Sequence, residues 1–184
     1  ARLVVSVCRL VLVAAFWLAG EAQRPELALG ILDNAQCNIP YAYEVQLEKG
    51  RILLHTGEHR VALQAFSAAI AFWEKTADPT DPDQLLDKAE ALLYRALLRE
   101  AEGMPSEAIA DLKAMLSISP DRPAMQARLR DLESGTTTHP PAHALLRSML
   151  RTYQDIRRQC DDPSHAHEET EHEHHEGCGH DNQG

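Results

Sequence analysis

Hydrophobic residues along this chain recur at the spacing of a helix rather than of a strand. Between residues 142 and 160 they fall at Leu145 and at 1, 4, 5, 8 and 11 residues after it, which places them in one stripe along a helix. No stretch of the sequence alternates hydrophobic and polar residues for long enough to predict a strand. Proline and glycine divide the pattern into segments, and we expect helices over 25–36, 41–56, 59–77, 85–102, 105–118, 123–133 and 142–160.

The connections and the composition agree with this pattern. Residues 77–84 read ADPTDPDQ and predict a loop, and residues 135–141 read GTTTHPP and predict a linker. Aromatic residues make up only 5% of the chain, whereas alanine and leucine are abundant, which favours helices over sheets. The sequence therefore predicts an all-α fold.

Two helix–turn–helix blocks share one internal order of small and large residues. They span residues 44–73 and 90–120, and they align when Gly57 is placed on Gly103. We expect large apolar residues where the next helix packs, and close approaches of neighbouring helices at six small residues: Gly50, Gly57, Ala62, Ala96, Gly103 and Ala108. The aligned pairs are Gly50 with Ala96, Ala62 with Ala108, Phe66 with Leu112, and Ile70 with Leu116.

This order resembles the tetratricopeptide repeat (TPR) family. The second block ends on the family's proline, Pro120, whereas the first has Glu74 there, and the turn glycines lie 46 residues apart instead of about 34. The resemblance implies about two hairpins with flanking or capping helices over residues 23–160, in a short right-handed superhelical stack. An ordinary helical bundle is the alternative.

In this family the first helix of each hairpin lines a concave face that binds peptides. The resemblance therefore implies a protein-binding groove, whose mostly leucine lining suits an apolar helix or an extended hydrophobic segment. The alternative is that flanking helices simply cover these leucines. The implied groove residues are Glu44, Leu47, Arg51, Leu54, Glu90, Leu93, Leu97 and Glu100.

The first 22 residues have the parts of a secretory signal peptide. Arg2 and Arg9 precede the apolar run 10–20, and Gly20-Glu21-Ala22 offers small residues at a cleavage site. An uncleaved membrane anchor and a buried core helix are the alternatives. We expect an exported protein, periplasmic or extracellular, with a membrane contact only if this segment is retained.

Cysteine usage leaves two interpretations open. In an oxidising compartment Cys37 and Cys160 would join the first helix of the body to the last by a disulfide. Alternatively Cys37 is a small buried apolar residue and the other thiols are free.

Negative charge is concentrated in the tail. The net charge of the chain is −10, and residues 161–184 hold eight acids without a lysine or arginine. A near-neutral body with an acidic tail argues against nucleic acid as a partner, because phosphate binding requires a basic face.

The tail also predicts metal binding. Imidazole and thiolate are ligands that Ni²⁺, Cu²⁺ and Zn²⁺ prefer, and the tail holds seven of them within sixteen residues. We expect loose binding by a chain that is also a solubilising acidic tail, and we expect no cofactor to be required. The candidate ligands are His165, His167, His172, His174, His175, Cys178 and His180.

Motifs of catalysis are absent from the sequence. It contains no GxSxG, P-loop, dinucleotide fingerprint, HExxH or CxxC, and His55 and His59 flank the turn glycine as ordinary polar residues. Three functions follow as hypotheses, none of them enzymatic. The chain is an exported adaptor for proteins with a metal-binding tail, a self-assembling oligomer or filament subunit, or a metal buffer or chaperone.

Deleting residues 164–184 tests the metal hypothesis directly. We expect the full chain to bind Ni²⁺, Cu²⁺ or Zn²⁺ with micromolar affinity at pH 7.5, and the deleted chain to lose that binding in isothermal titration calorimetry. Binding should also fall below about pH 6, because a ligating imidazole must be neutral. If both chains bound the metal equally well, the metal ligands would have to lie outside residues 164–184.

Overall fold

The computed structural model describes residues 11–12, 14–15, 18–19, 24–38, 42–136 and 138–149, except for the side chains of Cys37 and Asn38. Regular structure in these ranges is helical, and none of the residues described forms a strand. The predicted all-α fold class is therefore confirmed.

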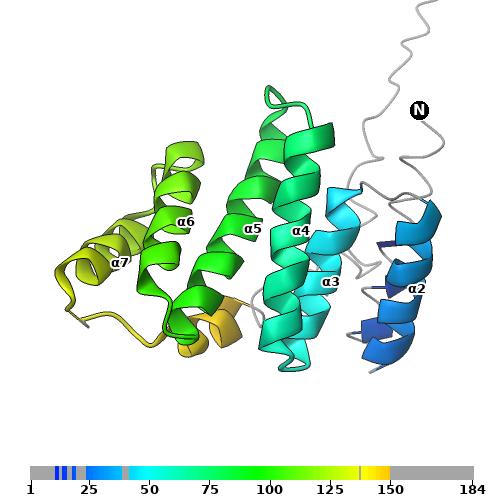
Figure 1. The fold of residues 1–184 in the computed structure, drawn as a ribbon, viewed down its shortest axis with the longest axis horizontal. Coiled ribbons are helices and arrows are strands. Elements are labelled where there is room, and N and C mark those ends of the chain that lie inside the picture. Colours follow the sequence, from blue (N-terminus) through cyan, green and yellow to red (C-terminus); the bar gives the residue numbers. More distant parts are fainter. Residues whose placement is uncertain are drawn as a thin grey trace, which may run out of the picture.

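The helices follow one another as a row of neighbours (Figure 1). Short turns join α3 to α4 and α5 to α6, so that these helices form two hairpins that lie side by side. Residues 142–149 form a further helical segment. The helices are α2 (Pro25–Asn38), α3 (Tyr43–His55), α4 (His59–Thr76), α5 (Pro82–Ala101), α6 (Pro105–Ile118) and α7 (Pro123–Ser134).

The start of α5 corrects the predicted loop over 77–84. A carboxylate oxygen of Asp81 accepts hydrogen bonds from the backbone N–H of Asp83 at 2.9 Å and of Gln84 at 3.4 Å, and Pro82 follows as the first helical residue. An N-terminal aspartate cap followed by proline is a favoured way to begin a helix. The loop therefore ends at the cap, three residues earlier than the prediction.

Both hairpins turn through a glycine with left-handed backbone. The φ angles are +84° at Gly57 and +77° at Gly103, a region that costs little only for glycine. In each turn the N–H of the next residue donates to the carbonyl five positions earlier, at 2.8 Å in both cases. This is the hydrogen-bond pattern that closes many helix C-termini, and it gives the two blocks the same turn.

A small residue faces a large one where the helices of the first hairpin meet. A Cβ placed on Gly50 would lie 2.6 Å from the ring of Phe66, whose side chain is fully buried. The second hairpin has Ala96 and Leu112 at the aligned positions, 1% and 0% exposed. A larger residue on one helix is thus matched by a smaller one on its partner.

Four of the six small residues predicted at close helix approaches are buried: Gly50, Ala62, Ala96 and Ala108. The prediction is wrong for the other two. Gly57 and Gly103 are exposed, and no atom lies within 4 Å of the place a Cβ would take. These two glycines allow the left-handed backbone of the turns, and they do not lie in the contact between helices.

Aromatic rings join the two hairpins. Phe66 on α4 stacks on Tyr94 of α5 with ring centroids 5.0 Å apart and an angle of 16° between the planes. Tyr94 is 2% exposed. The ring that fills the space above Gly50 therefore also holds the neighbouring hairpin, and one apolar core runs through α3, α4, α5 and α6.

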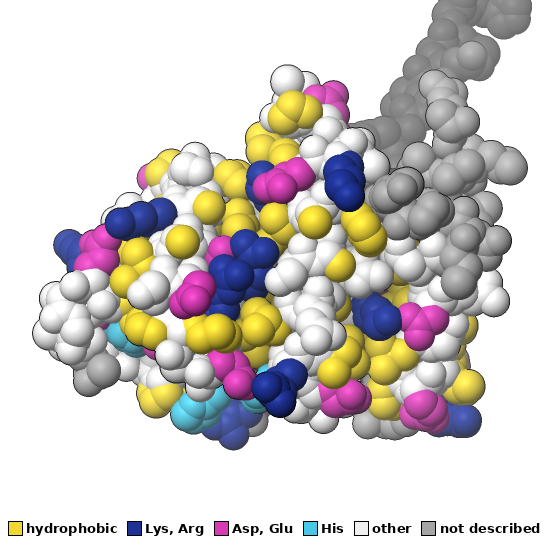
Figure 2. Space-filling model, in the orientation of Figure 1, with side chains coloured by type: hydrophobic (Ala, Val, Ile, Leu, Met, Phe, Trp, Pro, Cys, Tyr) yellow, Lys and Arg dark blue, Asp and Glu magenta, His cyan; other side chains and the backbone are white. Residues whose placement is uncertain are grey.

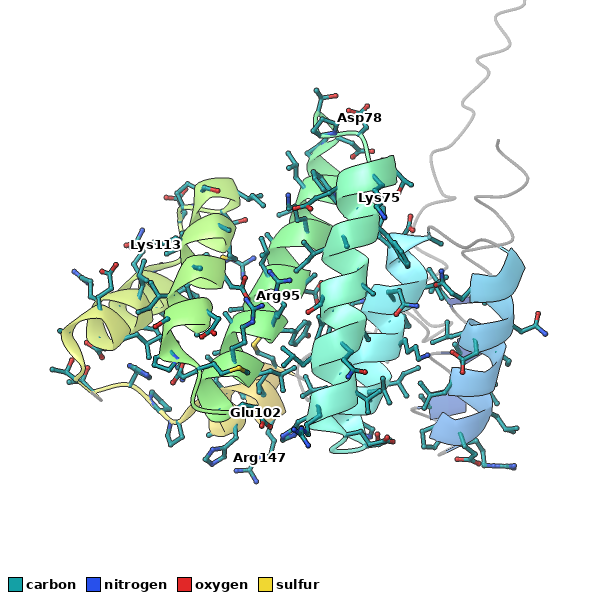
Figure 3. The ribbon with its side chains drawn as sticks, in the orientation of Figure 1. Lys75, Asp78, Arg95, Glu102, Lys113 and Arg147 are labelled. Carbon is teal, nitrogen blue, oxygen red and sulfur yellow. The ribbon has the colours of Figure 1, made fainter. Side chains whose placement is uncertain are left out.

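Within the second hairpin, an ion-pair cluster around a buried carboxylate joins α5 to α6. Asp111 of α6 is 3% exposed and accepts from Arg95 at 2.7 and 2.9 Å and from Arg99 at 2.7 Å. Figure 3 labels Arg95 between α4 and α6, and Figure 2 shows basic side chains at the same place within a surface of mixed apolar and charged groups. Because two guanidinium groups donate to the Asp111 carboxylate, its burial costs little free energy.

The described part of the N-terminal segment packs against the body. Ala15 and Ala19 are 0% and 7% exposed and belong to a small apolar cluster with Ala28 and Leu32 of α2 and Val45 of α3. This packing agrees with the alternative that the N-terminal segment forms a buried core helix. The signal peptide over residues 1–22 stays a prediction. Among the described residues no helix combines the length and apolar character needed to cross a membrane.

Residues 138–149, named here the return segment, lead the chain back from α7 toward the first hairpin. Gly135 ends α7 with a φ of +69°. In Figure 1 the helical part of the return segment lies behind the lower end of α5. Its Ala142 and Leu146 are 4% and 2% exposed and belong to the same core as α3 and α5.

The contact at Gly50 generates a prediction for stability. We expect Gly50→Ala to lower the free energy of unfolding by about 1–3 kcal/mol, because the added methyl overlaps the Phe66 ring. Adding Phe66→Leu should restore part of that loss, since the pair then matches Ala96 and Leu112. Urea denaturation of the two single variants and the double variant measures the coupling.

Gly30→Ala is the matched control for this series. Gly30 lies inside α2, and no atom is found within 4 Å of the place its Cβ would occupy. We expect it to raise the free energy of unfolding by about 0.5–1 kcal/mol through helix propensity alone. An equal effect of alanine at both glycines would contradict the close approach at Gly50.

Candidate functional site

The inner face is the surface of α3 and α5 made by the eight residues assigned to a groove from the sequence. Its four leucines are buried, with exposed fractions of 2% for Leu47, 4% for Leu54, 5% for Leu93 and 0% for Leu97. They belong to one apolar cluster that also includes residues of α7 and the return segment. All four leucines are therefore packed inside the molecule, and Leu47 lies among residues of α4 and α5.

An arginine links the two helices at the centre of this face. The Arg51 guanidinium of α3 donates to both carboxylate oxygens of Glu90 on α5, at 2.6 and 3.2 Å. It also donates to Glu48 at 2.9 Å. A bidentate pair fixes orientation as well as distance, so it holds α3 and α5 in register.

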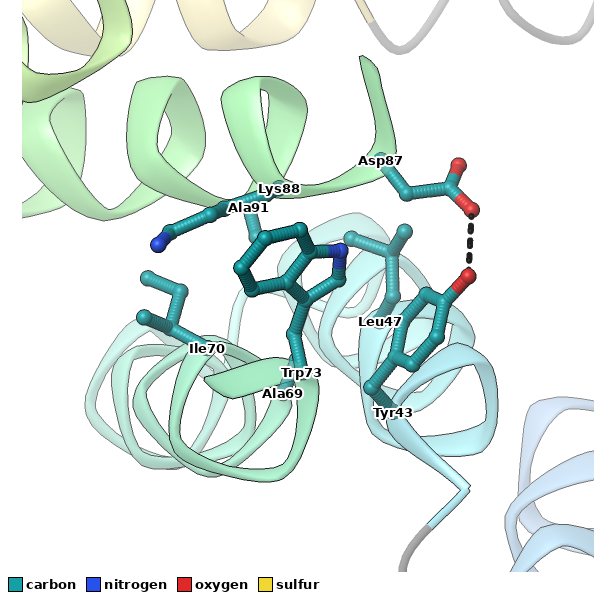
Figure 4. A pocket seen from close by; sticks show the side chains of 8 residues that line it. All are labelled: Tyr43, Leu47, Ala69, Ile70, Trp73, Asp87, Lys88 and Ala91. Atoms are coloured by element: carbon teal, nitrogen blue, oxygen red, sulfur yellow. Dashed lines mark hydrogen bonds between the residues drawn. The ribbon is translucent and has the colours of Figure 1, made fainter. Parts of the chain in front are cut away.

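Toward the N-terminal end of α5 the face is tightly packed around Tyr43 and Asp87 (Figure 4). The Tyr43 hydroxyl donates to Asp87 at 3.3 Å. Burial raises the pKa of Asp87 to about 6, the nearby Arg51 guanidinium opposes that rise, and the Glu90 carboxylate adds to it. Burial likewise raises the pKa of the Tyr43 hydroxyl.

Side chains of α4 and α5 complete this corner. The Trp73 indole N–H of α4 donates to the backbone carbonyl of Gln84 at 2.7 Å, and the Lys88 ammonium of α5 lies 4.2 Å from the centroid of the indole ring. With Tyr43 and Asp87 these groups fill the joint between the two hairpins, so that no room for even a water molecule remains among them. This corner is a packed joint and not a ligand pocket.

One apolar side chain remains open at the edge of the face. Leu86 is 51% exposed and precedes Glu90, Leu93 and Leu97 by four, seven and eleven residues on α5. Residues with this spacing share one side of a helix. The inner face therefore continues, past its buried leucines, to an exposed leucine next to the acidic residues.

The C-terminal end of the face is held by a buried ion pair. Arg128 of α7 is 2% exposed and donates to the two carboxylate oxygens of Glu100 on α5, at 2.7 and 2.9 Å. It also donates to the backbone carbonyl of Pro140 at 3.0 Å. One guanidinium thus joins α5, α7 and the return segment.

A hollow of about 230 Å³ opens where the return segment meets the first hairpin. Leu54 and Leu146 form its apolar part, and His59, His143 and Arg147 complete the lining. The hollow shows that the return segment lies against the turn end of α3 and α4. Its polar lining is two imidazoles and a guanidinium, and it contains none of the carboxylates that Ca²⁺ and Mg²⁺ prefer.

The predicted metal ligands and the predicted disulfide are not placed by this structure. The tail residues from His165 to His180 and the side chains of Cys37 and Cys160 lie outside what is described. Among the residues that are described, no group of three histidine, cysteine or acidic side chains is positioned to hold a metal ion.

Sequence reasoning missed the two groups that organise the ends of the inner face, Asp87 and Arg128. Arg128 did carry a signal, because it falls three residues after Met125 and four before Leu132, on the apolar side of α7. A charged residue on such a stripe predicts a buried partner. Asp87 lies three residues before Glu90 on α5, and only the position of Tyr43 shows what it contacts.

The inner face is made of buried leucines and paired charges. No family model matches the chain, and neither a curated protein nor a solved structure matches it. Its function is therefore inferred from its own residues and their geometry.

The pKa of Asp87 generates a prediction for the dependence of stability on pH. Because the folded-state pKa is about 6 and the unfolded value is 3.8, the folded state binds more protons between these values. The free energy of unfolding then falls as pH rises through this window. We expect Asp87→Asn to be more stable than the parent by about 1 kcal/mol at pH 8, after allowance for solvent screening of a half-buried group.

Chemical denaturation at pH 8 and pH 4 measures this difference, which should nearly vanish at the lower pH. Asp121→Asn is the control, since Asp121 is exposed in the connection between α6 and α7, and we expect no pH-dependent gain from it. A gain from Asp87→Asn that is the same at both pH values would mean that packing, and not ionisation, causes it.

Proposed function

We infer that the body of this chain is a non-enzymatic helical scaffold of the TPR type that binds a protein partner through its inner face. The observation that carries the proposal is that two hairpins with the same turn bring α3 and α5 together into one surface, joined by Arg51 and Glu90. Stacked helix pairs of this kind bind through such surfaces. The exposed Leu86 beside Asp87 and Glu90 gives the surface an apolar contact within an acidic rim.

The remaining parts of the proposal come from the sequence. An exported location would follow from the signal-like residues 1–22, and the His-rich tail would carry divalent transition metals on the scaffold. In this proposal the body selects the partner and the tail adds metal binding. The turn geometry and the packing of small against large residues support the resemblance to the TPR family.

Site-specific photo-crosslinking tests the binding surface in the intact chain. A benzophenone amino acid replaces Leu86 on the inner face in one variant and Val61 on α4 in the other. The two parent residues are apolar and similarly exposed, at 51% and 42%. We expect irradiation in the native source to give a covalent adduct with a partner from position 86 and none from position 61.

Adducts of equal yield from both positions would contradict a specific inner-face site. Adducts from position 61 alone would move the binding surface to α4 and overturn the proposal.

A further inference from the structure

The inner face already holds a helix, and that helix belongs to the chain itself. In the return segment Ala142 and Leu146 are buried, and Leu145 and Met149 are partly buried against the same apolar core. These four residues occupy positions i, i+3, i+4 and i+7, which is one stripe of a helix. The structure therefore shows which helical pattern this face accepts.

The leucines beneath the segment are those that the groove interpretation expected to be open. Leu54 and Leu146 line one hollow, and Leu54, Leu93 and Leu97 share the core with Ala142 and Leu146. Leu97 is 0% exposed. A partner that uses these leucines must therefore take the place of the return segment.

Polar contacts hold the beginning of the segment. His139 lies with Nδ1 3.0 Å from Asp131 of α7 and Nε2 3.3 Å from Glu100 of α5. Thr138 also hydrogen-bonds Asp131, and Arg128 donates to Pro140. These contacts tie the end of the segment nearest α7 to α5 and α7, separately from the apolar contacts of its helical part.

We propose that the return segment is a built-in occupant of the inner face, and that the partner is an amphipathic helix that displaces it. This inference rests on the proposed function, because it takes the inner face as the binding surface. The partner helix carries a small residue at position i and larger apolar residues at i+3, i+4 and i+7, matching Ala142, Leu145, Leu146 and Met149.

Displacement is favourable only for a partner that binds better than the tethered segment. Ordering the segment costs conformational entropy that offsets much of the gain from burying its apolar side chains. A tethered segment nevertheless competes at a high effective concentration. The apparent affinity for a partner is thus lowered by the fraction of molecules in which the face is covered.

The test uses full-length chains and a fluorescein-labelled synthetic peptide with the sequence of residues 138–149. Leu146→Asp places a charge where the side chain is 2% exposed and prevents the segment from docking. Ser148→Asp introduces the same charged residue at an exposed position of the same segment, outside the hollow that Leu54 and Leu146 line, and is the matched control. Fluorescence anisotropy measures the affinity of each chain for the peptide.

We expect the Leu146→Asp chain to bind the peptide at least tenfold more tightly than the parent and the Ser148→Asp chain. A peptide that carries Leu146→Asp itself should bind none of them. Equal affinity of the parent and the Leu146→Asp chain would overturn the inference that the face is covered, yet leave the proposed function standing.

Hydrogen–deuterium exchange of the parent chain keeps the test independent of the variant's folding. An excess of unlabelled peptide should speed amide exchange in residues 142–149 and leave α6 unchanged. Peptide binding without that change would place the peptide elsewhere and overturn the inference. Absence of peptide binding by a Leu146→Asp chain with the parent's circular dichroism spectrum would overturn it as well, whereas failure of crosslinking from position 86 would count against the proposed function.

A second copy of the chain is the competing occupant. If the parent dimerises in analytical ultracentrifugation and Leu146→Asp abolishes the dimer, the face belongs to the return segment of another copy. That result would overturn the assignment of a separate partner.

Discussion

The buried Arg128 guanidinium constrains α5, α7 and the return segment together. A guanidinium cannot be deprotonated at the pH of a cell, so its burial requires that its donors be paired. Glu100 and the carbonyl of Pro140 provide those acceptors from two different parts of the chain. Movement of α7, or of the start of the return segment, would leave a charge without its partners. The coverage of the inner face is therefore coupled to the position of the last helices.

Local features of the sequence were sufficient to predict most of the helices. Gly57 and Gly103 end helices because their left-handed φ angles are costly for other residues, and that information is local. The start of α5 was missed although its signal is also local, since Asp81 followed by Pro82 was taken as loop composition and is a helix cap. The close approach at Gly50 was predictable as a small position, but the identity of the opposing ring required the pairing of α3 with α4.

The inner face was harder to predict because burial depends on elements far apart in the chain. Glu100 and Arg128 are separated by 28 residues, and Arg51 and Glu90 by 39. The sequence indicates only that Glu48, Asp111 and Arg128 are charged residues on apolar stripes, and each proves to be buried. Which partner each one meets depends on how the helices pack. The four leucines assigned to the groove are buried in one apolar cluster, and that cluster also includes Ala142 and Leu146 of the return segment, which lies beyond the repeat-like region.

Trp73 makes the joint between the two hairpins observable in the intact protein. Its indole is 7% exposed, donates to a carbonyl at the start of α5 and lies beneath the Lys88 ammonium. The excited state of indole has a large dipole, so its emission wavelength responds to charges and water at this distance. The chain has one other tryptophan, Trp17, in the N-terminal segment. Replacing that residue would turn the ultraviolet fluorescence of the protein into a local optical gauge of whether α4 and α5 remain in contact.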